Sequence, residues 1–154
     1  MTTVTRRTLA VAIAAVCLST TAFAQDRGTK EEAKAMVDAA YDHIQKVGAE
    51  QAYKDFTNDK ADWVKKDLYV MVYDGKNVNL AHGANPKLVG KDMTAVKDAD
   101  GKPIVSTLNA VAAKGSGWHD YDWPDPVTKK IMMKSTYVRK APGGDGFVGV
   151  GVFR

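Results

Sequence analysis

Residues 67–82 read DLYVMVYDGKNVNLAH, and they give the strongest indication of the fold class. The run Leu68–Tyr73 is rich in β-prone residues and is apolar on both faces, as expected of a strand that is covered on both sides. Residues 74–77 have turn chemistry, and Val78–His82 is predicted to return as a second strand. The stretch therefore predicts an antiparallel hairpin that is buried on both faces.

The segment Thr29–Phe56, before this hairpin, is predicted to be helical. Thr29 and Glu32 have the spacing of a capping box at its start. Apolar residues recur every three or four positions and form one stripe: Ala33, Met36, Val37, Ala40, Ile44 and Val47. Gly48 weakens the pattern, so the helix is expected to kink or restart there.

After the hairpin, the pattern predicts loops, one short helix and three further strands. Residues 83–91 and 98–103 carry Pro and Gly and read as loop and turn. Pro103 suits the first turn of a helix that runs to about Ala113. The strands are predicted at 118–123, 130–140 and 146–153. This order predicts a single α+β domain whose antiparallel sheet of about five strands has a long N-terminal helix on one face. The loop-and-helix segment would cover the other face and leave a cavity for a small ligand.

The first 24 residues have the features of a signal peptide. Arg6 and Arg7 precede the apolar run Leu9–Leu18, which is too short to span a bilayer. Residues 22–24, Ala-Phe-Ala, then match a signal peptidase site. We expect cleavage after Ala24 and a mature domain of residues 25–154 that is periplasmic or secreted. Whether the paired arginines direct the Sec or the twin-arginine route is left open.

Composition excludes several functional classes. The chain has 22 Lys+Arg and 18 Asp+Glu, and without Arg6 and Arg7 the balance falls to 20 against 18, so no nucleic-acid binding is expected. Cys17 is the only cysteine and would leave with the signal peptide, which removes disulfides and thiol chemistry. No metal-binding spacing and no nucleophile elbow is present, so neither a metal, a cofactor nor an enzymatic activity is expected.

Six short motifs together resemble the single Cache domains, which are extracellular PAS-like sensor modules. They are DLYVMVYD (67–74), AHGANP (81–86), LVGKD (88–92), KDADGK (97–102), GSGW (115–118) and KSTYV (134–138), accompanied by Tyr121, Trp123, Pro124 and Pro126. The resemblance implies a PAS-like fold whose pocket binds small organic ligands, often short carboxylates. Such domains usually report through a membrane helix. Because the sequence ends at Arg154, we expect no transmembrane or signalling module in this chain.

A carboxylate pocket needs hydrogen-bond donors and aromatic walls. Lys134 lies in an apolar strand and is the obvious counter-charge, while His82 can donate to an oxygen. Met71 and Tyr73 share one face of the first strand and could form the floor. Trp118 and Tyr121 have opposite strand parity, so one regular face cannot hold both. The candidate ligand-binding residues are Met71, Tyr73, His82, Trp118, Tyr121, Lys134 and Tyr137.

The leading functional interpretation is therefore a periplasmic binding protein for a small organic anion. One alternative is an interaction or adaptor module whose apolar N-terminal helix pairs with a second copy, as a homodimer, or with a membrane receptor. A less favoured alternative is a cofactor-free periplasmic enzyme.

Overall fold

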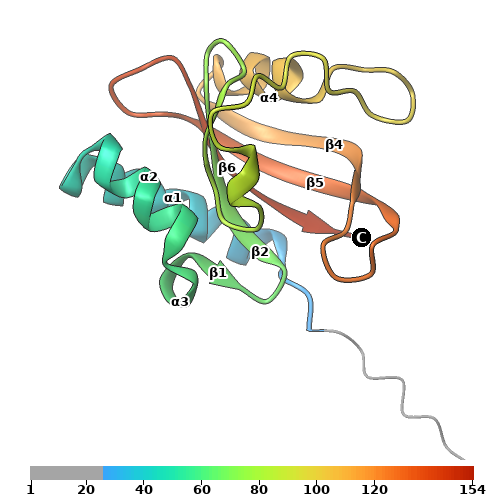
Figure 1. Ribbon diagram of the computed structural model, residues 1–154, viewed down its shortest axis with the longest axis horizontal. Coiled ribbons are helices and arrows are strands. Elements are labelled where there is room, and N and C mark those ends of the chain that lie inside the picture. The colour runs from blue at the N-terminus through green and yellow to red at the C-terminus, as the bar shows by residue number, and fades with distance from the viewer. Residues whose placement is uncertain (1–25) are drawn as a thin grey trace, which may run out of the picture.

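An antiparallel sheet forms the centre of the molecule, and helices lie on both of its faces (Figure 1). The computed structural model describes residues 26–154, so the predicted signal peptide lies outside the described residues. In chain order the elements are α1 (Lys30–Val47), α2 (Ala49–Asn58), α3 (Lys60–Trp63), β1 (Val64–Lys65), β2 (Leu68–Asp74), β3 (Asn79–His82), the 3-10 helix η1 (Pro86–Leu88), α4 (Ile104–Ala112), β4 (Ser116–Pro124), β5 (Ile131–Lys140) and β6 (Gly146–Phe153).

The strand order places the C-terminal strand in the middle of the sheet. Five of the six strands follow the order β1-β2-β6-β5-β4, and the sixth, β3, pairs with β2. All of these pairs are antiparallel. Val150 on β6 stands opposite Val70 on β2 and Tyr137 on β5, so the predicted hairpin and the three-strand meander join through β6. The predicted α+β architecture is confirmed, with β1 as an additional two-residue strand.

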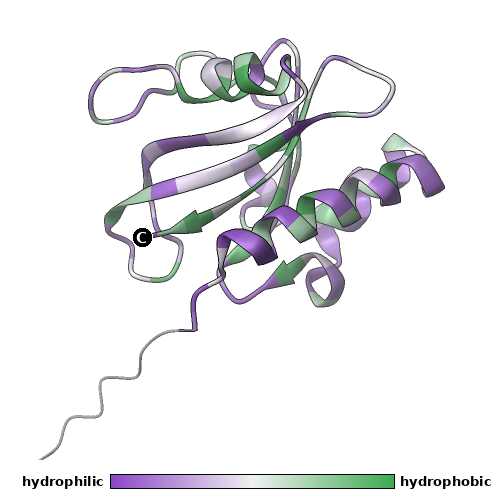
Figure 2. Cartoon of the chain, turned by 180° about the vertical axis from the view of Figure 1, so that it is seen from behind, coloured by the Kyte–Doolittle hydropathy of each residue, from purple (hydrophilic) through white to green (hydrophobic). Residues whose placement is uncertain are grey.

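The helices α1 and α2 cover one face of the sheet. Thr29 and Glu32 form the predicted capping box, in which each side chain accepts a hydrogen bond from the other residue's backbone N–H. Gly48 has φ +86°, a left-handed conformation that few other residues adopt, and it separates the two helices. Along α1, apolar and polar residues alternate with the helical period (Figure 2). Its apolar stripe packs on Leu68, Val70 and other inward-facing strand residues.

The helix α4 and the segment of residues 83–103 cover the opposite face, as predicted. Ile104, Val105 and Leu108 are buried there against Met71 and Tyr73. The sheet therefore has an apolar core on each side, which explains why β2 is buried along almost its whole length. The elements α3, β1 and η1 were not predicted, because segments of two to four residues leave no readable period.

Within residues 26–154, no helix combines the length and the apolar character that crossing a bilayer requires.

Candidate ligand-binding site

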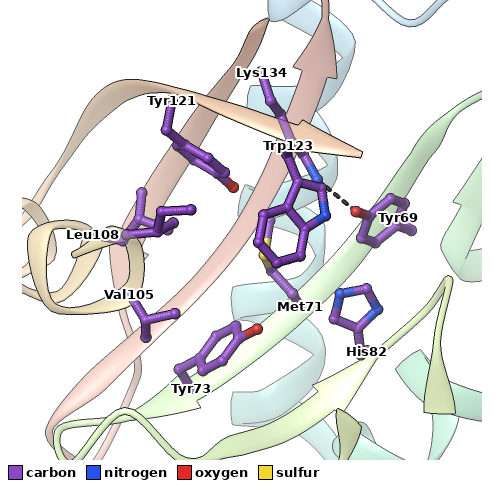
Figure 3. A pocket seen from close by; sticks show the side chains of 10 residues that line it. Tyr69, Met71, Tyr73, His82, Val105, Leu108, Tyr121, Trp123 and Lys134 are labelled. Carbon is purple, nitrogen blue, oxygen red and sulfur yellow. Dashed lines mark hydrogen bonds between the residues drawn. The ribbon is translucent and has the colours of Figure 1, made fainter. Parts of the chain in front are cut away.

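A small cavity lies between the sheet and α4 (Figure 3). Its volume is about 20 Å³, close to the room that one water molecule needs. Strands β2, β3, β4 and β5 and the helix α4 all contribute to its wall. The lining residues are Tyr69, Met71, Tyr73, His82, Ile104, Val105, Leu108, Tyr121, Trp123 and Lys134.

Among residues 26–154, Lys134 is the only lysine or arginine that lines the cavity, and its side chain is almost completely buried. Nζ donates a hydrogen bond to the Tyr69 hydroxyl at 2.5 Å and lies 4.3 Å from the centre of that ring. The Phe153 ring lies 4.9 Å away on β6. No ion pair to Lys134 is found within residues 26–154. Burial lowers the pKa of Lys134 to about 7, although the charges of Asp67 and Asp125 oppose the shift.

His82 provides a neutral polar group beside this lysine. It is 4% exposed, and its ring centre lies 4.9 Å from that of Tyr69. Burial, together with the charges of Lys134 and Lys60, lowers the pKa of His82 to about 3. Nδ1 accepts a hydrogen bond from the Asn85 backbone N–H at 3.0 Å. A neutral imidazole that accepts at Nδ1 carries its proton on Nε2, so this atom is a donor.

Two tyrosines add hydroxyl groups to the wall. Burial raises the pKa of Tyr73 to about 12 and raises that of Tyr121 further, so both stay protonated at neutral pH. The Tyr121 hydroxyl is 2.9 Å from Thr136 Oγ1, and either oxygen can act as the donor. Met71, Val105 and Leu108 supply apolar surface to the same wall (Figure 3). The cavity thus combines one ammonium, neutral donors and an apolar wall.

Five of the seven predicted residues meet in this cavity: Met71, Tyr73, His82, Tyr121 and Lys134. The other two, Trp118 and Tyr137, do not. They are register partners on β4 and β5, and their ring centres lie 5.2 Å apart on the face covered by α1. The reason is strand parity, since residues 118 and 121 point to opposite faces of a regular strand. Their predicted place in the pocket is corrected accordingly.

Sequence reasoning missed Tyr69 and Trp123. Both could have been found from the same parity, because Tyr69 shares a face with Met71 and Tyr73, and Trp123 shares one with Tyr121. The contribution of α4 depends on how the helix docks, and its own sequence does not reveal this.

A second missed feature is an ion cluster near the start of α1. The Arg27 guanidinium donates to Asp125 Oδ2 at 2.8 Å and to Asp67 Oδ2 at 3.1 Å. Both carboxylates are almost completely buried. The Arg27 hydrogen bond is the main reason why the pKa of Asp125 lies well below its usual range. Arg27 thereby ties the segment before α1 to the turn that follows β4.

Comparison with known proteins decides the family. A family model described as Single Cache domain 2 matches residues 4–154. The chain belongs to this family. Domains of this family are non-enzymatic sensor domains that bind ligands outside the cytoplasm. Within residues 26–154, no cluster of three His, Cys, Asp or Glu side chains could hold a metal ion.

Two curated relatives that match part of this chain are sensory proteins. The chain is 33% identical over 88 residues to the sensor histidine kinase MctS of Rhizobium johnstonii, a match that covers 57% of this chain and 19% of the relative. It is 30% identical over 88 residues to the methyl-accepting chemotaxis protein McpP of Pseudomonas putida, which covers 56% of this chain and 16% of that protein. The matches therefore span less than a fifth of either relative.

Solved structures confirm the fold. A methyl-accepting chemotaxis protein of Vibrio parahaemolyticus aligns with a TM-score of 0.69 at 24% identity and covers 80% of this chain and 87% of its own. A Cache chemosensory domain studied for carboxylic acid recognition aligns with a TM-score of 0.65 at 27% identity. The alignment covers 80% of this chain and 91% of that domain. The periplasmic sensor domain of a chemotaxis protein aligns with a TM-score of 0.63 at 27% identity. The alignment covers 78% of this chain and 91% of that domain.

Proposed function

We propose that this Cache domain is exported to the periplasm and reversibly binds a short organic carboxylate without changing it chemically. The observation that carries the proposal is Lys134, an ammonium buried in an apolar cavity with one hydrogen bond and no ion pair within the described residues. Burying a charge without a partner is costly. An anion in the cavity would supply that partner.

The remaining wall groups suit a carboxylate with a short apolar chain. His82 Nε2–H and the tyrosine hydroxyls are neutral donors, so they can bind oxygen atoms without adding competing charge. Met71 and Leu108 can contact the carbon chain. A charge-assisted hydrogen bond contributes about 1.5–3 kcal/mol, so Lys134 would provide the largest single contribution to affinity.

The comparisons support the same ligand class. One structural neighbour, 27% identical over most of this chain, is a chemosensory domain described for its recognition of carboxylic acids. That property belongs to the neighbour, and its transfer to this chain rests on the cavity just described.

Calorimetric titration of the domain with propionate tests the proposal. Lys134→Met keeps the aliphatic length and removes the charge, so the dissociation constant should rise roughly ten- to a hundredfold. Lys140→Met, an exposed lysine on the same strand, is the matched control and should bind as the native domain does. Propionamide, which has no charge, should bind far more weakly than propionate. Equal affinity of the Lys134→Met variant and the native domain would overturn the proposal. So would the lack of any thermal shift with acetate, propionate, lactate and pyruvate.

A further inference from the structure

The cavity and a larger surface cleft share a common wall. The cleft has a volume of about 420 Å³ and lies beside the cavity. Tyr69, His82 and Trp123 line both spaces. The rest of the cleft is formed by the segment after β3, the last residue of β4 and the turn that follows it: Ala84, Asn85, Leu88, Pro124, Asp125, Pro126 and Lys129. These three side chains therefore separate the inside of the cavity from the surface.

Two of the three wall residues are held in place. The Tyr69 hydroxyl accepts the hydrogen bond from Lys134, and His82 Nδ1 accepts one from the Asn85 backbone. Tyr69 and His82 are 3% and 4% exposed. Trp123 is only partly buried, and its indole makes no hydrogen bond within residues 26–154. It also lies near the end of β4, followed only by Pro124 before the turn begins.

The indole of Trp123 forms part of the wall between the cavity and the cleft. Figure 3 shows its ring lying across the cavity in front of Met71. Tyr121 meets the ring edge-on, with the two ring centres 6.3 Å apart. A space of about 20 Å³ holds no more than a water molecule, so any carboxylate enters only when one wall side chain shifts. Of the three shared residues, Trp123 is the one that can shift without breaking a hydrogen bond.

We infer that Trp123 determines specificity, because its indole must shift to admit the acid and the extent of that shift limits the chain length of the bound acid. The inference rests on the proposed function. A carboxylate on Lys134 leaves its carbon chain to fill the space enclosed by α4 and Trp123. Without the indole, the cavity opens into the cleft, whose Leu88, Pro124 and Pro126 offer apolar surface to a longer chain.

The test compares chain-length profiles. The native domain, Trp123→Ala and Trp123→Phe are titrated with acetate, propionate, pentanoate and hexanoate. Trp123→Ala should improve the affinity for hexanoate relative to propionate by at least tenfold, and Trp123→Phe should change the ratio in the same direction by less. Trp118→Ala, on the same strand but on the opposite face, is the control and should leave the ratio unchanged.

The possible outcomes distinguish a failure of the Trp123 inference from a failure of carboxylate binding. An unchanged hexanoate-to-propionate ratio in both Trp123 variants overturns the inference and leaves carboxylate binding standing. A ratio that changes equally in Trp118→Ala also overturns it, since the effect would then be a general loosening of the fold. No binding of any acid by the native domain overturns both proposals. Circular dichroism of each variant checks folding, and Trp123→Phe keeps the test decisive if Trp123→Ala does not fold.

Discussion

Lys134 on β5 and Tyr69 on β2 are joined by a 2.5 Å hydrogen bond across the intervening strand β6. The two residues are 65 positions apart in the sequence. Phe153, the register partner of Lys134 on β6, packs its ring beside the ammonium. The position of this charge is therefore set by the pairing of three strands, which makes it a fixed feature of the sheet.

Binding of a carboxylate should weaken as pH rises above about 7. The pKa of Lys134 is lowered to about 7 by burial, so the free domain loses the ammonium above that pH. A bound anion favours the charged form and raises this pKa, so the dissociation constant should increase up to about tenfold per pH unit above 7. His82 does not contribute, because its pKa of about 3 keeps it neutral throughout. Calorimetric titration of propionate between pH 6 and pH 9 measures the profile.

Lys134→Met is the control for this profile and should show a flat pH dependence over the same range. A pH profile of the native domain as flat as that of the variant would contradict the proposal that the Lys134 ammonium binds the carboxylate. The stability of the ligand-free domain should instead increase as pH rises above 7. Its folded state holds the Lys134 proton less tightly than the unfolded chain, so this burial cost is largest below pH 7 and disappears above about 10.5.

The ion cluster of Arg27 should make the domain sensitive to acid. Arg27→Met leaves two buried carboxylates without their cation, so the free energy of unfolding at pH 7 should fall by about 3 kcal/mol. The pKa of Asp125 is lowered in the folded state, so its contribution is complete above about pH 4 and is lost as pH falls further. The difference between the variant and the native domain should therefore shrink in acid.

Urea denaturation at pH 7 and pH 3 measures this difference. Lys54→Met, which breaks an exposed pair with Glu50 within one helix, is the control and should change stability by less than about 0.5 kcal/mol. A difference between Arg27→Met and the native domain that stays constant down to pH 3 would show that the cluster is not the cause.

The elements that could be predicted from the sequence are those with a clear hydrophobic pattern and flanking turn residues. The capped helix has an apolar stripe of helical period, the strand Leu68–Tyr73 is a continuous apolar run, and the three strands of the meander are separated by Pro- and Gly-rich turns. The cavity wall could be predicted where a residue's own strand gave its orientation, as for Met71 and Tyr73, while ligand binding by these residues stays a prediction. Trp118 and Tyr137 lie outside the cavity, because strand parity places residue 118 on the face opposite Tyr121 and residue 137 on the face opposite Lys134. The cluster of Arg27 with Asp67 and Asp125 could not be read at all, since it joins three segments that no local pattern relates.

Gly151 on β6 should be required for the position of Lys134. It stands opposite Thr136 in the register, and a Cβ at this position would overlap the Lys134 side chain and lie 2.6 Å from Thr136 Oγ1. Gly151→Ala should therefore displace the ammonium, lower stability by about 1–3 kcal/mol through overpacking, and raise the dissociation constant for propionate about tenfold. Thermal unfolding and calorimetry measure the two effects. Gly144→Ala, where a Cβ would meet no atom within 4 Å, should be neutral in both. If Gly151→Ala lost stability but kept native affinity, the lysine stem could repack without moving its charge, and the sheet would not fix the ammonium as rigidly as its hydrogen bond to Tyr69 implies.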